Sequence, residues 1–561
     1  MTRRVRARCA VGFVAAVAAA GVLAACGSSG GNSGSGTSST GPRGTVTGSF
    51  TSAPYVADFN PFNPGYVAAV TNGMVYEPLM FFNTAVAGSV QPWLATSYAW
   101  GAGGTSLTFS LRHNVTWTDG KAFTSADVAF TFNLIKSNSA LNQYGLPIVS
   151  ATANGPYSVT ITFTQPVYTD LYFIAGKLMM LPQHIWSTVK DYTTWTNPHP
   201  VGTGAYTVTK VTPQVLIATA NPHYYLPGLP KVKTYQFLVY TTNTTADAAI
   251  ESGQLGWSGG FIPNINQTYL AKDPKYHLVD IPLSVDYLIA NMKKGPTTSL
   301  ALRQAVSAAI DRNYISKSVY DGYAPPTDPE GLLMPNLQNI ASPETKADSF
   351  GAPAPAQSKQ ILQAAGYKLG SNGMFSTPSG QPLSVDVKVV SGWTDYLSIL
   401  QILGPELKAA GINMTVTQEA YSVWTTDQDT GNFQFLLSNA GYTPVPYSFY
   451  YNLLASAVTK PLGTAETIGN FGRYSNTTVD GLLNTIASTT DSATQNQAFY
   501  QIESIFKSQL PDIPLMEAQD EVEFNGNVVT NFPTTTNPWA GAATWLNPDD
   551  GWVAARLTPV K

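Results

Sequence analysis

Two spacings of apolar residues alternate along the chain and together predict an α/β protein. Residues 107–112 (LTFSLR) are apolar at alternate positions over most of their length, the period of a strand with one buried face. Residues 124–127 (TSAD) match a capping box, so a helix is expected to begin there. Apolar residues at helical spacing predict another helix over 300–310, and the segment 361–365 ends at Gly366, a residue type that commonly closes helices. Strand and helix patterns follow one another in this way throughout, which favours the α/β class.

The beginning of the chain has the pattern of an export signal. Four arginines lie within the first eight residues, and residues 10–25 contain no charged side chain. This apolar run is shorter than the roughly 20 residues that a membrane-spanning helix needs, but it suits the core of a signal peptide. It ends in LAACG (23–27), which resembles the lipobox of bacterial lipoproteins, so we expect cleavage before Cys26 and acylation of its thiol. The alternatives are a plain secretory signal in which Cys26 has no role, and twin-arginine export through Arg3 and Arg4.

The two cysteines do not provide a disulfide for the mature protein. Cys9 lies within the expected signal peptide (1–26) and would be removed with it. An exported protein with two cysteines suggests a disulfide, but one lipid-modified cysteine accounts for this pair better. Residues 27–45, rich in Gly, Ser and Thr, predict a flexible tether. We therefore expect a protein held to the outer face of the cell membrane by a lipid on Cys26.

Charge is sparse and slightly negative. Charged residues make up 11% of the chain, against about a quarter in ordinary globular proteins, while hydrophobic residues make up 44%. The formal net charge is −4, and loss of the arginine-rich signal would make the mature protein more acidic. Nucleic acid is therefore not an expected partner. No later apolar run reaches membrane length, so the body is predicted to be soluble, with two or three domains.

One segment makes the chain recognisable. Residues 111–128 read LRHNVTWTDGKAFTSADV and resemble the segment LR-x-x-V-x-W-x-D-G-x-x-h-T-A-x-D-V of the family 5 extracellular solute-binding proteins, the dipeptide and oligopeptide receptors of ABC importers. Other landmarks of that family occur in the family's order over nearly the whole mature chain, with Ala205 where the family usually has proline. They are YEPL (76–79), PVGTGAY (200–206), NPHYY (221–225), Asn291 with Pro296, LRQA (302–305), AIDR (309–312), AAGY (364–367) and PDIPL (511–515).

The resemblance implies a fold and a function. The fold would be the two-lobed α/β architecture of type II periplasmic binding proteins, of the large cluster with an extra subdomain in lobe I. The protein would capture an oligopeptide between hinged lobes and deliver it to the permease subunits of an ABC importer, without catalysis. We expect a monomer, because the permease must reach both lobes. The implied division is 46–75, 198–287 and 520–561 for lobe I, 76–197 for the subdomain and 288–519 for lobe II.

Most landmark residues are expected to support the fold. Asp119 and Gly120 form a turn signal in which glycine accepts a positive φ. The glycines of GTG (202–204) are expected to let two backbones approach closely. Arg303 and Arg312 flank a helix, and we expect them to pair with carboxylates.

By analogy with the family, the ligand would be held by loops at strand ends. Aromatic rings there offer apolar area and a polar edge, which suits sugars as well as peptide side chains. For any single tryptophan, burial in the core is the competing interpretation. The residues predicted to line the cleft are Phe59, Asn60, Trp257, Trp393, Trp424, Asn439 and Tyr442.

The chain departs from the family at one telling place. Peptide receptors of the family usually carry an aspartate after a strand of lobe II, which pairs with the α-ammonium of the ligand. The corresponding segment here, NAGYTPVPY (439–447), contains no carboxylate. Because burial of an ammonium without a counter-charge costs several kcal/mol, another acid would have to serve, and Asp395, Asp427 and Asp429 in neighbouring loops are the options. The peptide interpretation leads, and an oligosaccharide ligand is the alternative.

Motifs for catalysis, metals or cofactors are few. The five histidines show neither metal-ligand spacing nor an HExxH motif, and there is no GxxxxGK[ST] sequence. The one G-x-S-x-G match, GSSGG (27–31), falls in the tether, where no strand-to-helix elbow can form. We therefore expect no enzyme activity, no cofactor and no metal site. A secreted hydrolase and a purely structural surface lipoprotein are the rival classes, and nickel or haem carriage, known in relatives, is not favoured by the histidines.

Overall fold

The computed structural model describes residues 41–560 except 52–53, 64–66 and 442. The alternating segment forms strand β5 (Ser106–Leu111), and the capping box begins helix α2 (Ser125–Ser137). There the Asp127 carboxylate accepts the Thr124 N–H at 2.9 Å. The two other predicted helices are α5 (Leu300–Ala309) and α7 (Pro355–Ala364). The short-range patterns were therefore interpreted correctly.

The first large sheet has seven strands and contains the first described strand. At its centre β1 pairs in parallel with β10 and β11, and the antiparallel pair β8–β9 extends one side. In spatial order the strands are β12 (Tyr276–Val279), β20 (Val522–Asn525), β11 (Trp257–Gly259), β1 (Arg43–Thr51), β10 (Val232–Val239), β9 (Val215–Ala220) and β8 (Tyr206–Thr212).

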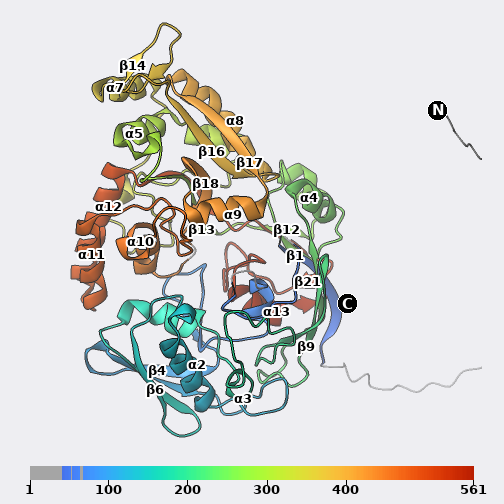
Figure 1. The fold of residues 1–561 in the computed structure, drawn as a ribbon. Helices are drawn as coiled ribbons and strands as arrows, with labels where there is room; N and C mark the ends of the chain where they lie inside the picture. Colours follow the sequence, from blue (N-terminus) through green and yellow to red (C-terminus); the bar gives the residue numbers. More distant parts are fainter. Residues whose placement is uncertain (1–40, 52–53, 64–66, 442, 561) are drawn as a thin grey trace, which may run out of the picture. The chain divides into compact units, whose positions relative to one another are not determined.

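The second large sheet has five strands from the later part of the chain. Strand β13 runs antiparallel to its neighbours β18 and β19, and β16 runs parallel to β17 and β18. Helix α8 (Thr394–Ala409) packs on β17 and α9 (Tyr421–Thr430) on β16 (Figure 1). In spatial order the strands are β17 (Asn413–Glu419), β16 (Ser384–Val390), β18 (Phe435–Ala440), β13 (Pro282–Ala290) and β19 (Asp512–Gln519).

The chain passes between these two sheets at two adjacent segments. Residues 280–281 join β12 to β13, and residues 520–521 join β19 to β20. The Asp520 N–H donates to the Ile281 carbonyl oxygen at 2.7 Å, so the two crossings lie side by side. Short crossing strands of this kind are where one lobe can rotate against the other.

A four-stranded antiparallel sheet lies within residues 76–197 and packs into the same hydrophobic core as the seven-stranded sheet. Its order is β4 (Ala95–Trp100), β5, β7 (Ser158–Phe163) and β6 (Ile148–Ala153). The exact domain boundaries stay a prediction. The remaining strands are β2 (Met80–Phe82), β3 (Val90–Pro92), β14 (Lys368–Leu369), β15 (Phe375–Ser376), β21 (Val529–Thr530) and β22 (Thr558–Pro559). The remaining helices are α1 (Ala68–Thr71), α3 (Gln183–Trp186), α4 (Asn243–Glu251), α6 (Arg312–Val319), α10 (Pro446–Leu454), α11 (Thr477–Ser488), α12 (Ser492–Gln509) and α13 (Asp549–Arg556).

Three of the sequence landmarks meet at one buried carboxylate. Glu77 of YEPL accepts hydrogen bonds from Trp93 Nε1 at 2.8 Å, Thr203 Oγ1 at 2.9 Å and the hydroxyls of Tyr224 and Tyr225 at 2.7 and 3.1 Å. Burial raises the pKa of Glu77, and these four donors lower it. YEPL, PVGTGAY and NPHYY therefore join the four-stranded sheet to the seven-stranded one, which is a structural role.

The glycine interpretations are confirmed. Gly120 has a φ of 87°, the left-handed region that glycine tolerates. A Cβ on Gly202 would lie 1.9 Å from the carbonyl oxygen of Val75, and one on Gly204 would lie 2.2 Å from that of Met74. Both glycines thus allow two backbones to touch.

We expect Gly202→Ala to lower the free energy of unfolding by about 3 kcal/mol or more, because the new methyl group overlaps a backbone oxygen that cannot move alone. Gly481 in α11 is the matched control, since it is exposed and nothing lies within 4 Å of its would-be Cβ. Gly481→Ala should raise stability by about 0.5–1 kcal/mol through helix propensity. Urea unfolding followed by tryptophan fluorescence measures both, and equal effects would contradict the close-approach interpretation.

The two arginines have the expected structural role, but the expectation of carboxylate partners was wrong. Arg303 donates to the carbonyl oxygens of Leu510 and Thr297 at 2.7 and 2.8 Å, and Arg312 Nε donates to that of Pro514 at 2.8 Å. Among the described residues neither forms an ion pair with a carboxylate. The last carbonyl groups of a helix, such as those of Gln509 and Leu510 at the end of α12, have no partner within the helix, and a guanidinium has enough donors to serve several carbonyl oxygens.

No helix in the described ranges is both long and apolar enough to cross a membrane. The expected signal peptide, Cys26 and most of the tether lie outside the described residues. Tyr442 lies outside them as well.

Candidate functional site

A cavity of about 420 Å³ lies between the seven-stranded and the five-stranded sheets. The first sheet contributes the ends of β10 and β11 and the start of α4, and the second contributes β13, β18 and the starts of α8 and α9. Ala518, Gln519 and Glu521, at one of the crossings, line it as well. Its size and its place between two lobes are typical of a site for a small ligand.

Three carboxylates from three different elements line this cavity. Asp286 lies in β13 and is 2% exposed, Asp395 lies in the first turn of α8, and Glu521 lies at the crossing. The Tyr396 hydroxyl donates to Asp286 Oδ1 at 2.6 Å, and the Tyr323 hydroxyl donates to Glu521 Oε1 at 2.9 Å. None of the described lining residues is Lys, Arg or His. The cavity therefore has negative groups without a built-in cation.

Asp395 also connects the two sides of the cavity. The side chain of Asn243, at the start of α4, donates to Asp395 Oδ1 at 3.3 Å and to Thr394 Oγ1 at 3.2 Å. The Asn243 N–H donates to the Gly392 carbonyl oxygen at 3.3 Å. The position of Asp395 in the first turn of a helix favours its ionised form, because the helix N-terminus is partially positive. Of the three acids, Asp395 is thus the best placed to be charged.

The surroundings oppose ionisation of all three acids. Burial raises the pKa of Asp286 to about 7, with the negative charge of Asp395 adding to the effect. Burial raises the pKa of Asp395 to about 6. Burial and then the charge of Asp395 raise the pKa of Glu521 well above its usual range. A cation entering the cavity would favour the ionised forms and would be bound in return.

Aromatic rings form one wall of the cavity and continue into a second one. Trp393 contacts Tyr396, Tyr421 and Trp424, with ring centroids 5.7, 6.0 and 5.5 Å apart. Trp393, Tyr421 and Asn439 also line a neighbouring cavity of about 360 Å³, together with Trp424. We call the first the acidic cavity and the second the aromatic cavity. Because they share a wall, a ligand longer than one residue can contact both.

The structure separates six of the seven predicted binding residues into two groups; the seventh, Tyr442, lies outside the described residues. Trp393 and Asn439 line both cavities, and Trp424 lines the aromatic one. Phe59 and Asn60 are fully buried, and the Asn60 side chain donates to the backbone oxygens of residues 192 and 195. Trp257 is also fully buried and donates to the carbonyl oxygen of residue 542 at 2.9 Å. These three lie in the protein interior, outside the lining of the two cavities.

Of the three aspartates considered as substitutes for the missing acid, one lines the acidic cavity. Asp395 does so, whereas Asp427 forms an ion pair with Lys388 on the neighbouring strand. Asp429 is not among the residues that line either cavity. Sequence position alone did not distinguish them, because all three follow strands of the same predicted lobe.

Several cavity residues were missed by sequence reasoning. Asp520 Oδ2 accepts the backbone N–H groups of residues 542–543, at 2.8 Å each, and so holds the late loop against the crossing. The next residues, Thr544 and Trp545, line the acidic cavity, and the Trp545 ring covers Gly259. The local acidity of the sequence DEVE (520–523) was the one available signal, since acids in a strand-rich segment need a reason to be there.

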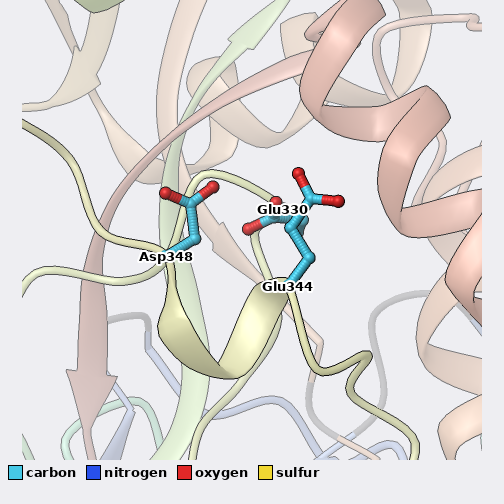
Figure 2. A group of neighbouring side chains, drawn as sticks. All are labelled: Glu330, Glu344 and Asp348. Carbon is cyan, nitrogen blue, oxygen red and sulfur yellow. The ribbon is translucent and has the colours of Figure 1, made fainter.

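A second acidic group lies elsewhere, in the loops before α7. Oxygen atoms of Glu330, Glu344 and Asp348 lie within 4.8 Å of one another (Figure 2). Lys507 of α12 forms ion pairs with all three, at 3.1 Å from Glu330 and 3.2 Å from Glu344. The ammonium already supplies the positive charge that a metal ion would bring, so we interpret the group as an ion-pair network.

Comparisons with known proteins give one family. Residues 89–460 match the bacterial extracellular solute-binding proteins, family 5 Middle. The nickel-binding periplasmic protein of Escherichia coli is 25% identical over 467 residues, which cover 80% of this chain and 84% of the relative. A putative ABC transporter peptide-binding protein of Brucella ovis is 28% identical over 340 residues, 58% of this chain and 61% of the relative.

A solved structure shows the same fold. The mannohexaose-bound periplasmic oligopeptide-binding protein of an oligopeptide ABC transporter from Thermotoga maritima superimposes with a TM-score of 0.83. The two are 24% identical, and the alignment covers 92% of this chain and 98% of that one. The predicted two-lobed, type II periplasmic-binding-protein-like α/β fold is thereby confirmed.

Proposed function

The chain belongs to the bacterial extracellular solute-binding proteins of family 5, and we propose that it captures oligopeptides for an ABC importer. The observation that carries the proposal is Asp395, which stands in the cavity between the lobes and contacts Asn243 from the opposite side. We assign to Asp395 the role of pairing with the α-ammonium of the peptide. This would supply the counter-charge that the segment 439–447 lacks.

The acids support a peptide over a neutral sugar. A neutral sugar would leave Asp286, Asp395 and Glu521 close together without a cation, and any of them that stayed ionised in the closed cavity would lack a counter-charge. An ammonium supplies that counter-charge. The aromatic wall around Trp393 suits either ligand, and the Thermotoga protein holds a mannohexaose. An oligosaccharide is therefore the second candidate.

The remaining parts of the proposal concern delivery. Closure of the lobes about the crossings at 280–281 and 520–521 would present a ligand-bound form to the permease. A lipid on Cys26 and the tether 27–45 would hold the receptor at the outer face of the membrane as a monomer. We propose a binding role without catalysis, because the family is one of binding proteins.

Thermal unfolding of the purified protein tests the proposal. A ligand at a hundred times its dissociation constant adds about 2.7 kcal/mol to the stability of the folded form, so trialanine should raise the midpoint measurably. Mannohexaose and nickel chloride are the comparison ligands. Stabilisation by mannohexaose but not by trialanine would overturn the peptide assignment and support the sugar.

A further inference from the structure

The acidic cavity contains more carboxyl groups than one ammonium can pair with. Asp286, Asp395 and Glu521 line the same 420 Å³, and the charge of Asp395 acts on both of the others. Their hydrogen-bond donors are the neutral side chains of Tyr396, Asn243 and Tyr323. A peptide with an uncharged first residue would satisfy Asp395 and leave two acids without a cation.

Asp286 and Asp395 belong to the lobe of the five-stranded sheet and Glu521 lies on the second crossing, so closure of the other lobe over them would shield all three from water. Asp286 lies in the five-stranded sheet near the first crossing, Glu521 lies on the second crossing, and Asp395 begins α8. Like charges in a low-dielectric cavity repel strongly, so the closed cavity disfavours the ionised forms of all three acids until cations enter. Binding of two cationic groups would therefore stabilise the closed form more than binding of one.

An independent feature of the same cavity also points to a ligand with several donors. Thr544 is fully buried and lines the acidic cavity, and its Oγ1 has no hydrogen-bond partner among the described residues. A buried hydroxyl without a partner is uncommon and costly. An ammonium has three N–H donors, so one cation can satisfy a carboxylate and this hydroxyl together.

The aromatic cavity contains a buried hydrogen-bond donor without an acceptor. Trp424 is 4% exposed and lines it, and its Nε1 donor has no partner among the described residues. A peptide carbonyl oxygen is an acceptor that would satisfy this N–H. The two cavities share the wall formed by Trp393, Tyr421 and Asn439, so a ligand with cations at one end and carbonyl groups further on matches both.

We propose that the site selects ligands whose end carries two neighbouring cationic groups, as in peptides with lysine, arginine or ornithine at the first position. This inference rests on the proposed function, which it narrows to one class of peptide. Asp395 pairs with the α-ammonium, and Asp286 and Glu521 take the side-chain cation. A free diamine carries the same chemistry without a peptide backbone.

Isothermal titration calorimetry of the full protein with three probes tests this selection. Lys-Ala-Ala should bind roughly 10- to 100-fold more tightly than norleucine-Ala-Ala, the range expected for one added charge-assisted hydrogen bond. The norleucine side chain matches the aliphatic part of lysine but lacks the ammonium group. The third probe, 1,5-diaminopentane, tells whether two cations suffice without the backbone.

Two variants assign the effect to the cavity. Glu521→Gln keeps an acceptor for the Tyr323 hydroxyl and should abolish most of the preference for Lys-Ala-Ala over norleucine-Ala-Ala. Circular dichroism and the midpoint of thermal unfolding show that the variant is folded. Glu523→Gln is the matched control. Glu523 lies two residues after Glu521, is 1% exposed and accepts a hydrogen bond from the Ser258 hydroxyl, and neither residue lines the cavity. It should retain the full preference.

The outcomes separate the two proposals. Equal affinity for the lysine and norleucine peptides would overturn the dication inference and leave the peptide receptor intact. Binding of 1,5-diaminopentane with no binding of either peptide would support the dication chemistry and overturn the peptide function. Absence of binding by all three probes would overturn both.

Discussion

Asp395→Asn is expected to weaken peptide binding about 100-fold. The substitution keeps the shape of the side chain and an acceptor for Asn243, but it removes the negative charge facing the ligand's ammonium. Loss of one partner from a desolvated charge pair costs roughly 2–5 kcal/mol, and each 1.4 kcal/mol is a factor of about ten in affinity. Calorimetric titration of trialanine into both proteins measures the change.

The chain offers a matched control for this prediction. Asp429 lies in the same lobe and was an equal candidate on sequence grounds, but it lines neither cavity. Asp429→Asn should leave the affinity within about twofold of the original. Nα-acetyl-trialanine is the matched control on the ligand side, because it lacks the ammonium. It should bind the original protein and Asp395→Asn equally weakly. If acetylation leaves the affinity of the original protein unchanged, Asp395 does not pair with the amino terminus.

The ligand-free protein is expected to be most stable in mildly acidic solution and to lose stability as the pH rises. Burial raises the pKa of Glu517 and of Asp520 to about 8, and those of Asp328 and Asp512 to about 7. Such a group binds its proton more tightly in the folded protein than in the unfolded chain. Its contribution is therefore complete below about pH 4 and is lost progressively as the pH rises from there to about 8.

The size of this effect follows from the number of such groups. For each acid that is still protonated in the folded protein but ionised in the unfolded chain, the free energy of unfolding falls by about 1.4 kcal/mol per pH unit. Several such acids act together. We expect the midpoint of thermal unfolding to fall by about 5 °C or more between pH 5 and pH 8, since about 1 kcal/mol shifts a protein of this length by about 1 °C. Differential scanning calorimetry at constant ionic strength measures it.

Variants attribute the pH effect to particular carboxyl groups. Asp520→Asn keeps an acceptor for the N–H groups of residues 542–543 and should flatten the decline. Asp273 has a pKa lowered by its hydrogen bonds with Lys275 and Asn527, so it is already ionised at pH 5. Asp273→Asn should leave the slope unchanged. A midpoint that rises from pH 5 to pH 8 would show that the buried acids are not protonated in the folded state.

Most of the fold could be predicted from local sequence patterns. The capping box at 124–127 begins α2, because a helix start is decided by residues adjacent in sequence. Gly202 and Gly204 lie where two backbones touch, because only a residue without a side chain fits there. The landmark motifs identified the family, which residues 89–460 match. The predicted partners of Arg303 and Arg312 were wrong, because a guanidinium can donate to carbonyl oxygens as well as to carboxylates. The sequence does not show which of these acceptors lies near the side chain in space.

For the candidate site, too, some features could be predicted from the sequence and others only from the tertiary structure. By itself the sequence determined the class of protein and the absence of an acid in 439–447. Of its six described cleft candidates, three line the cavities: Trp393, Trp424 and Asn439. Only the tertiary structure decided that Asp395, Asp286 and Glu521 share one cavity. Those acids lie more than a hundred residues apart and are brought together by strand pairing and the two crossings. The field that a ligand meets depends on such distances in space, and spacing along the chain does not contain them.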